Sequence, residues 1–566
     1  MPAFVIRSLS APLPARSSPD SLLTLSIDQA IDQSINQNKD ETSPTISTSR
    51  GALIITSIGL LIFLQATNIS ILTTTQSSIA NDLDAFEQAT WLTSSYLIAM
   101  SSFAPLMGRL CQVFSPRLCM FTSTMIICVG TIITSTSVSF EMFMVGRVVT
   151  GSGAAGILIV ASIIVVQMAS AKRRGLYIGL INTCMTVGLS LGAVIAGALE
   201  PKIGWKPLFG VQAPLSLLAG FGLLAGIPAQ YGASKNDYTD LKLRQKLARI
   251  DYSGALLLTT TIVLFLFGLS GPQVLATPLI LSALALPVFV MNETYVAKDP
   301  IIPITVLKSR GTLLTCLATT GFMMARWCVL FYTPVYALAV RGWEPAVAGS
   351  ILIPTNAGFA AGGLLAGVYH IRRNGSFYVH SVFSMALLPI TLLILAFIST
   401  AENSWGLYVL IVFCNGLVAG ASLNYTLVHL LHLTVPEIHP IVLSLLATFR
   451  GFAGSFGSAI GGGLFGRVLD KSLRRGFAEA GLEHRGDLIR RLLGSPALVN
   501  GLEGREKDIA VNSYEQALKA LFLGGVGLAT LVVLIQASTG WKQPSIKEQQ
   551  REEPEVDDEE GRVAGL

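Results

Sequence analysis

The feature that most constrains this fold is a succession of apolar stretches, each about as long as a helix that crosses a membrane. Such a helix needs about 20 mainly apolar residues. Only 13% of the 566 residues are charged, against about 25% in average soluble chains. We therefore expect an all-α integral membrane protein with about fourteen transmembrane helices. The expected spans are 52–75, 91–110, 118–138, 142–168, 176–198, 207–229, 252–270, 275–293, 312–339, 346–369, 379–399, 405–430, 441–467 and 514–537.

An even number of spans places both ends of the chain on one side of the membrane, and basic residues indicate which side. Short loops after even-numbered spans are basic, as at Lys172, Arg173 and Arg174, whereas those after odd-numbered spans hold few basic residues. Because Lys and Arg accumulate in cytosolic loops, we predict that both tails are cytosolic. The segment 470–512 would then be an exterior loop although it carries eight Lys and Arg residues. Longer loops cross the membrane with less regard to charge.

Two glycine-rich spans suggest an internal repeat. The fifth span contains Gly188, Gly192 and Gly197, and the thirteenth reads "RGFAGSFGSAIGGGLFG". Small residues at such spacing let helices approach closely in lipid, and related halves are typical of transporters. The expected regions are a disordered cytosolic tail (1–50), a first six-helix half (51–230), a cytosolic linker with an inserted helix pair (231–295), a second six-helix half with a long exterior loop at 470–512 (296–540), and an acidic cytosolic tail (541–566).

Several short motifs, by their order and spacing along the chain, resemble the major facilitator superfamily. "GRLCQVFSPR" is similar to that family's cytosolic loop signature and retains Gly108, Arg109 and Arg117. "RVVTGSGAAG", which contains Gly151, resembles its fourth-helix signature, and the glycines of the fifth span resemble its antiporter signature. "LLATFRGFAGSFGSAIG", with Arg450, resembles the fourteen-helix drug:proton antiporter branch, as does "FYTPVYALAVRGWEPAVAGSILIP". That branch includes fungal vacuolar basic-amino-acid transporters and multidrug or toxin efflux pumps.

The resemblance implies a major-facilitator-type bundle and assigns conformational roles to these glycines and arginines. Two departures bear on function. Gln112 stands where the loop signature has an aspartate, which should weaken an ion-pair latch between conformations. Asn68 stands in the first helix where the branch commonly carries Asp or Glu. The usual proton-binding carboxylate is therefore missing.

Polar residues inside the apolar spans are the candidates for function. A charge at membrane depth costs about 2.5–3.5 kcal/mol on insertion scales and usually has a partner or a role. Arginines qualify in three spans, whereas no Asp or Glu lies near the middle of any span. By the resemblance, spans 1, 4, 9 and 12 face the cavity. The candidate substrate-binding residues are Gln65, Asn68, Arg147, Arg326, Asn424 and Tyr425.

Structural alternatives exist for several of these residues. Arg147 would also serve as a bridge between helices through backbone carbonyls, and Arg450 would also snorkel to the membrane surface. His429 and His432 lie one turn apart, but no Glu or Cys completes a metal-binding set. We expect interfacial histidines and no metal site. We expect no cofactor either.

The leading functional hypothesis is a secondary transporter that exports a small organic molecule such as a drug, toxin or secondary metabolite. The expected partners are a small-molecule substrate, protons as a candidate coupling ion, and the lipid bilayer. Nucleic acid is not an expected partner, the chain is expected to be monomeric, and the plasma membrane is favoured over the vacuolar membrane. The nearest alternative is a vacuolar basic-amino-acid transporter, although a cationic substrate favours a buried carboxylate. A transporter-like nutrient sensor is a further alternative, and an enzyme is disfavoured because no catalytic set is evident.

Overall fold

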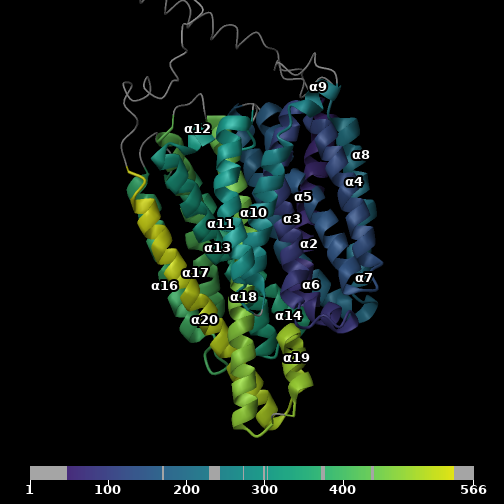
Figure 1. Ribbon diagram of the computed structural model, residues 1–566, viewed down its shortest axis with the longest axis vertical. Helices are drawn as coiled ribbons and strands as arrows, with labels where there is room; N and C mark the ends of the chain where they lie inside the picture. The colour runs from purple at the N-terminus through teal and green to yellow at the C-terminus, as the bar shows by residue number, and fades with distance from the viewer. Residues whose placement is uncertain are drawn as a thin grey trace, which may run out of the picture. The chain divides into compact units, whose positions relative to one another are not determined.

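The computed structural model describes residues 47–168, 171–228, 243–271, 273–297, 300–302, 304–370, 377–434, 439–482 and 484–540, and this part of the chain is built from helices (Figure 1). The first helices are α2 (Thr48–Asp82), α3 (Ala89–Val113), α4 (Pro116–Ser135), α5 (Phe140–Met168), α6 (Ala171–Ile203), α7 (Lys206–Gly210) and α8 (Gln212–Gly226). Next come α9 (Leu243–Ala248), α10 (Tyr252–Ser270), α11 (Ala276–Met291) and the π-helix η1 (Asn292–Val296). The last are α12 (Ile304–Leu307), α13 (Arg310–Ala339), α14 (Pro345–Ser350), α15 (Leu352–Leu364), η2 (Leu365–His370), α16 (Tyr378–Ile398), α17 (Trp405–His432), α18 (His439–Glu479), α19 (Gly486–Gly494), η4 (Pro496–Gly501) and α20 (Gly504–Ala537).

The all-helical membrane fold expected from the sequence is confirmed. Within the described residues, twelve helical segments are long and apolar enough to cross a membrane. The expected spans 91–110 and 441–467 form α3 and α18, which are not among those twelve. The number fourteen therefore stays a prediction.

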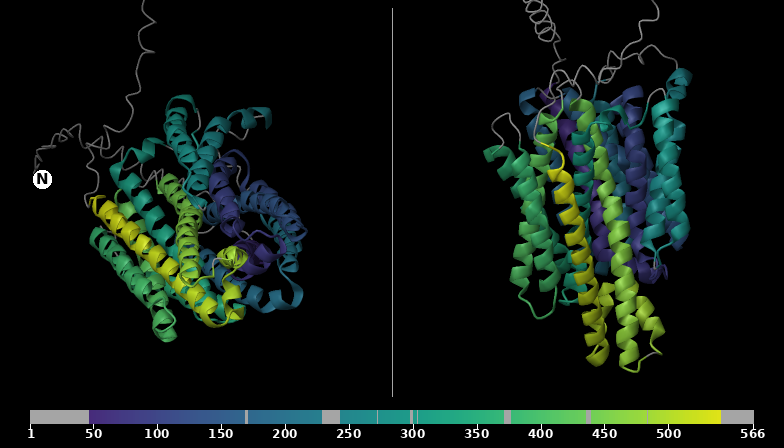
Figure 2. Two further views of the ribbon diagram at one scale, coloured as in Figure 1. Left: turned by 60° about the horizontal axis from the view of Figure 1, so that its bottom comes forward. Right: turned by 60° about the vertical axis from the view of Figure 1, so that its left-hand side comes forward.

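The helices form two groups with separate apolar cores. One core joins buried side chains of α2 to α8, including Leu61, Met120 and Val160. The other joins side chains of α13 to α20, including Phe322 and Leu518. Figure 2 shows the purple and blue helices of the first group beside the green and yellow helices of the second. Helix α10 contacts α3 of the first group and α18 of the second, and α11 packs on α10.

Small side chains line one contact between the two groups, along α3 and α18. Ser94 donates a 3.3 Å hydrogen bond to Ser458, and Ser101 donates a 3.0 Å hydrogen bond to Ser455. Helix α10 packs on this contact. Its Phe267 lies 5.6 Å from Trp91 of α3, measured between ring centroids, and Arg467 of α18 donates to two carbonyl oxygens at the end of α10.

The second contact between the groups lies along α6, α14 and α15. A Cβ added to Gly197 would lie 2.6 Å from the backbone of Ala346, and one added to Gly349 would lie 2.8 Å from the carbonyl oxygen of Ala193. Neither neighbour is a flexible side-chain end, so glycine is required for this approach. Here the two groups meet backbone to backbone.

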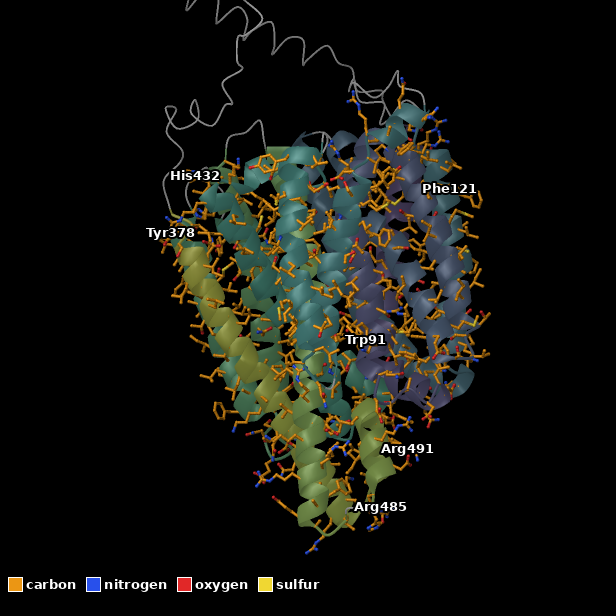
Figure 3. The ribbon with its side chains drawn as sticks, viewed as in Figure 1. Trp91, Phe121, Tyr378, His432, Arg485 and Arg491 are labelled. Atoms are coloured by element: carbon orange, nitrogen blue, oxygen red, sulfur yellow. The ribbon has the colours of Figure 1, made fainter. Side chains whose placement is uncertain are left out.

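The segment expected as an exterior loop, 470–512, is largely helical. Helix α18 continues to Glu479, and α19 and η4 follow before α20 begins at Gly504. Exposed pairs one turn apart, Arg474–Asp470 at 2.8 Å and Arg475–Glu479 at 2.7 Å, support the extension of α18. Figure 3 labels Arg485 and Arg491 on this segment, at the opposite end of the bundle from Tyr378 and His432.

We call the part of this segment between α18 and α20 the strap (480–482 and 484–503). Arg490 of the strap forms ion pairs with Asp84 at 3.1 Å and Glu87 at 3.2 Å, in the turn between α2 and α3. A Cβ added to Gly494 would lie 2.5 Å from the Cα of Phe86. The strap thus joins the second helix group to the first.

Two helices of the second group pack unusually closely. A Cβ on Gly358 of α15 would overlap the carbonyl oxygen of Phe413 in α17, and one on Gly362 would overlap that of Leu417. In the opposite direction, a Cβ on Gly416 or Gly420 of α17 would overlap a carbonyl oxygen of α15. Two small-xxx-small pairs therefore face each other, which is a common means of helix association in lipid.

Candidate functional site

The polar cluster around Arg147 occupies the core of the first helix group. Arg147 is fully buried; its Nε donates to the carbonyl oxygen of Leu92 at 3.2 Å, and its Nη1 donates to the amide oxygen of Asn68. Asn68 in turn donates to Gln212 Oε1 at 2.9 Å. The guanidinium also lies over the ring of Tyr96, 4.5 Å from its centroid. Arg147 therefore bridges α5, α2, α3 and α8 through neutral partners.

A small pocket lies beside this cluster. Its lining includes Gln65, Asn68, Tyr96 and Gln212, and it has room for about one water molecule. Gln65 donates to the carbonyl oxygen of Ala154 at 3.3 Å, while its own amide oxygen has no hydrogen-bond partner among the described residues. Gln65 and Asn68, the candidate residues of the first span, are thus packed against protein. As it stands, the pocket is too small for an organic substrate.

Arg326 lies at the contact between the helix groups. It sits in the middle of α13, is only 4% exposed, and donates from Nη2 to Asn356 Oδ1 of α15 at 2.9 Å. Asn356 then donates to Ser190 Oγ of α6 at 3.0 Å. Arg326 Nη1 is buried and has no hydrogen-bond partner among the described residues. A buried charged donor thus remains available where the two groups meet.

One aromatic ring lies against this arginine, and two others come from the same helix, α13. Its Cζ lies over the ring of Phe359, 4.1 Å from the centroid. The next residue, Trp327, stacks on Phe331 with centroids 5.4 Å apart and contributes to the apolar cores of both groups. Arg450 of α18 is close enough for its charge to act on Arg326. The surroundings are therefore apolar and positively charged.

The structure places Asn424 and Tyr425 apart from these two clusters. Asn424 donates to Gly420 of its own helix at 3.1 Å and lies against Gly363 of α15. Tyr425 stacks on Phe377, with ring centroids 6.2 Å apart, at the end of the bundle that also carries Tyr378. Of the predicted substrate residues, the described contacts link Asn68 directly to Arg147 and place Gln65 on the same pocket. Arg326 has a separate set of partners.

The predicted conformational residues lie mainly at helix contacts. Gly188 and Gly192 let α6 approach α2, since a Cβ at either would lie under 3.0 Å from α2 atoms, and Gly197 faces α14. Gly151 packs against Tyr96 of α3, whereas Gly108 is less crowded. Arg109 and Arg117 are partly buried near the turn between α3 and α4. The side chain of Gln112 lies outside the described residues.

Of the described residues, no group of three or more His, Cys, Asp or Glu side chains is arranged to hold a metal ion. His429 is buried in α17 with its Nε2 3.3 Å from Thr539 Oγ1. It packs on Tyr378, with ring centroids 5.6 Å apart. These contacts give His429 a packing role in the second group.

Sequence reasoning missed four residues of these clusters: Tyr96, Ser190, Gln212 and Asn356. A signal was present for two of them, because an amide inside an apolar span needs a hydrogen-bond partner. The sequence could not show which helices would supply the partners. Ser190 and Tyr96 gave no signal, since both residue types are common in membrane helices.

Two groups of membrane-crossing helices, joined along contacts rich in small residues and holding buried arginines, define a transporter-type membrane protein. The sequence profile of the Major Facilitator Superfamily matches residues 58–458. The chain belongs to this superfamily, as the motifs predicted.

Relatives of known description include two proteins of fission yeast, Schizosaccharomyces pombe. The vacuolar membrane amino acid uptake transporter fnx2 is 24% identical over 77% of this chain and 75% of its own length. The multidrug resistance protein fnx1 is 24% identical over 86% of this chain and 90% of its own length. Among solved structures, a bacterial homologue of the human lysosomal transporter Spinster, in an inward-facing and occupied conformation, superposes with a TM-score of 0.57. It is 15% identical and covers 87% of this chain and 97% of that chain.

Proposed function

We propose that this protein is a secondary transporter that exports a small organic molecule, such as a drug, toxin or secondary metabolite, across the plasma membrane. The observation that carries the proposal is the placement of Arg326. It is a buried charge in the middle of a membrane helix, it lies at the contact between the two helix groups, and one of its nitrogens lacks a partner among the described residues. A buried donor left unpaired is unfavourable, so a substrate that supplies an acceptor would bind there.

The contacts between the two groups suit a protein that opens and closes. Along α3 and α18 they are hydroxyl pairs, Ser94 with Ser458 and Ser101 with Ser455. Polar contacts between membrane helices contribute on average only about 0.6 kcal/mol each. These two hydrogen bonds would therefore oppose separation of the groups only weakly, as alternating access requires.

The principal alternative is transport of basic amino acids at the vacuolar membrane, which the name of the relative fnx2 supports. The positive charges around Arg326 disfavour a basic amino acid as the substrate. Arg326 and Arg450 are both cationic, and the ion pairs found in the described part of the chain lie in the 470–512 segment and the turn that it contacts. A cationic substrate would meet repulsion there. The name of the relative fnx1 supports export of drug-like molecules.

The test is transport by the purified protein reconstituted into sealed vesicles, with and without an imposed pH gradient. The panel contains drug-like compounds, secondary metabolites, and the amino acids arginine and lysine. Arg326→Ala should reduce transport to the level of protein-free vesicles. Arg326→Lys should restore little, because a point charge does not reproduce the planar fork of a guanidinium.

Arg341→Ala is the matched control, because it removes the same charge just beyond the end of the same helix. Arg341 donates there to the carbonyl oxygens of Ala401 and Asn403. Normal transport by a correctly inserted Arg326→Ala protein would remove Arg326 from the substrate site. Binding without turnover for every compound would favour a sensor instead.

A further inference from the structure

We propose that the substrate of this transporter is an organic anion, a carboxylate attached to an apolar or aromatic body, and that Arg326 binds the carboxylate. This inference rests on the proposed transport function and specifies its substrate class. It follows from the charge and the unpaired donor of Arg326 and from the open space beside Gly451 of α18.

The first step is the hydrogen-bonding state of the guanidinium. One terminal nitrogen of Arg326, Nη2, is held by Asn356, which is itself anchored on Ser190. The other terminal nitrogen, Nη1, is buried without a hydrogen-bond partner among the described residues. The guanidinium is therefore fixed in place with one donor unused. An oxyanion is the acceptor that forms the strongest hydrogen bond with such a donor.

The second step is the local charge. The partner of Arg326 is an amide, and the nearby charged group that acts on it is the cation Arg450. A second positive charge that acts on Arg326 adds to its attraction for an anion and to its repulsion of a cation. The arginine of the first group, Arg147, is held by Leu92 and Asn68 and lies over Tyr96. Its Nη2 also lacks a hydrogen-bond partner among the described residues, but the pocket beside its cluster has room for only about one water molecule. We therefore assign Arg147 to a positioning role.

The third step is space and shape. Along α18, Trp327 packs against Gly454 and Gly457, but a Cβ added to Gly451, next to Arg450, would meet no atom within 4 Å. Open space therefore begins beside Arg450, one turn from the covered glycines. Phe359 and the stacked pair of Trp327 and Phe331 provide apolar surfaces near Arg326. The apolar body of an amphipathic anion would pack on such rings.

The experiment uses three probes that share one body and differ in charge: 4-phenylbutyrate, its neutral amide, and 4-phenylbutylamine. Uptake into vesicles containing the full-length protein is measured for each probe, and uptake by protein-free vesicles is subtracted. Binding to the purified protein is measured separately by the shift of the thermal unfolding temperature. The variants are Arg326→Gln, which keeps a side chain able to bond Asn356 but loses the charge, and Arg341→Gln as the control.

We expect uptake of the carboxylate to exceed that of the amide and the amine by about tenfold or more, as for a charge-assisted hydrogen bond. Arg326→Gln should lower carboxylate uptake by about tenfold and so remove this preference, and Arg341→Gln should leave it intact. Equal uptake of the three probes, or an equal loss of all three in Arg326→Gln, would overturn the inference.

Failure of the inference and failure of the proposed function give different results. Transport of other panel compounds without a preference for the carboxylate would retain the transporter and reject the anion. A thermal shift produced by the carboxylate alone and lost in Arg326→Gln, without transport of any compound, would retain the anion site and reject the export function. Absence of both transport and thermal shift for the carboxylate would reject the anion site.

Discussion

Arg147 donates a hydrogen bond to the amide oxygen of Asn68, and no carboxylate takes part in this contact. The pair lies in the buried core of the first helix group, and Gln212 extends it to α8. An amide neither gains nor loses a proton in the physiological range. Asn68 therefore adds no group to this cluster that could bind or release a proton.

Replacing Asn68 with aspartate should change the pH dependence of transport. Arg147 would tend to keep the new carboxylate ionised, whereas burial would favour its neutral form, so its charge would respond to pH and to conformation. Transport is measured from mildly acidic to mildly alkaline pH in the wild type, Asn68→Asp and Asn68→Ala. The alanine variant controls for loss of the amide. If the three profiles run parallel at equal levels of insertion, position 68 has no part in coupling.

The predicted topology places the strap on the exterior side of the membrane and both tails on the cytosolic side. An epitope inserted after Gly501 should react with antibody in intact cells, since the tails are predicted to be cytosolic from the basic loops. Residue 501 is suitable because a Cβ there would meet no atom within 4 Å. An epitope appended to the C-terminus is the control and should need permeabilisation. The opposite pattern of reactivity would invert the topology.

The strap contacts the turn between α2 and α3. We expect this contact to break when the two helix groups separate at the end of the bundle that carries the strap. Exposed ion pairs contribute about 0–1 kcal/mol each, so Arg490→Ala alone should have little effect on transport. A chemical cross-link between Glu87→Cys and Arg490→Cys, whose native side chains meet at 3.2 Å, should instead block transport. Cleavage of the linker should restore it. Each single cysteine treated with the same reagent is the control, and full activity of the cross-linked protein would show that this contact never opens.

The close contact of α15 with α17 should make Gly362→Ala destabilising by about 1–3 kcal/mol, the usual cost of overpacking. The added methyl group would overlap the carbonyl oxygen of Leu417. Gly527→Ala is the control, because no atom lies within 4 Å of a Cβ at that position, and its effect should stay within about 0.5 kcal/mol. Thermal unfolding in detergent measures both. Similar stability of the two variants would mean that α15 can shift away from α17.

Much of the fold was predictable because lipid imposes a simple rule: apolar runs of sufficient length become helices. The runs around Leu61 and Phe322 could therefore be placed from the sequence, and short motifs indicated the family. The strap could not, since its charged residues suggested a loop. Its position is set by contacts with residues far away in the sequence: Leu492 and Val499 are buried in the core of the second group, and Arg490 pairs with Asp84 and Glu87.

The candidate site was predictable only in part. Arg147 and Arg326 stood out because a charge within an apolar run is rare and costly. Their partners could not be identified from the sequence, because Gln212 and Asn356 form these hydrogen bonds only when their helices pack together. The prediction that six residues face one cavity rested on the resemblance. The structure instead distributes their contacts among three places.

The glycine contact between α15 and α17 has a mechanical consequence. The backbones of α15 and α17 approach closely along both helices. The two helices can slide or separate only by breaking many contacts at once, so we expect them to move as one rigid unit, here called the lever. One arm of the lever reaches α6 through Asn356 and Ser190. The other arm ends near Tyr425 and its stacked partner Phe377. We therefore expect a displacement at Arg326 to be transmitted along the α15–α17 pair to the aromatic end of the bundle.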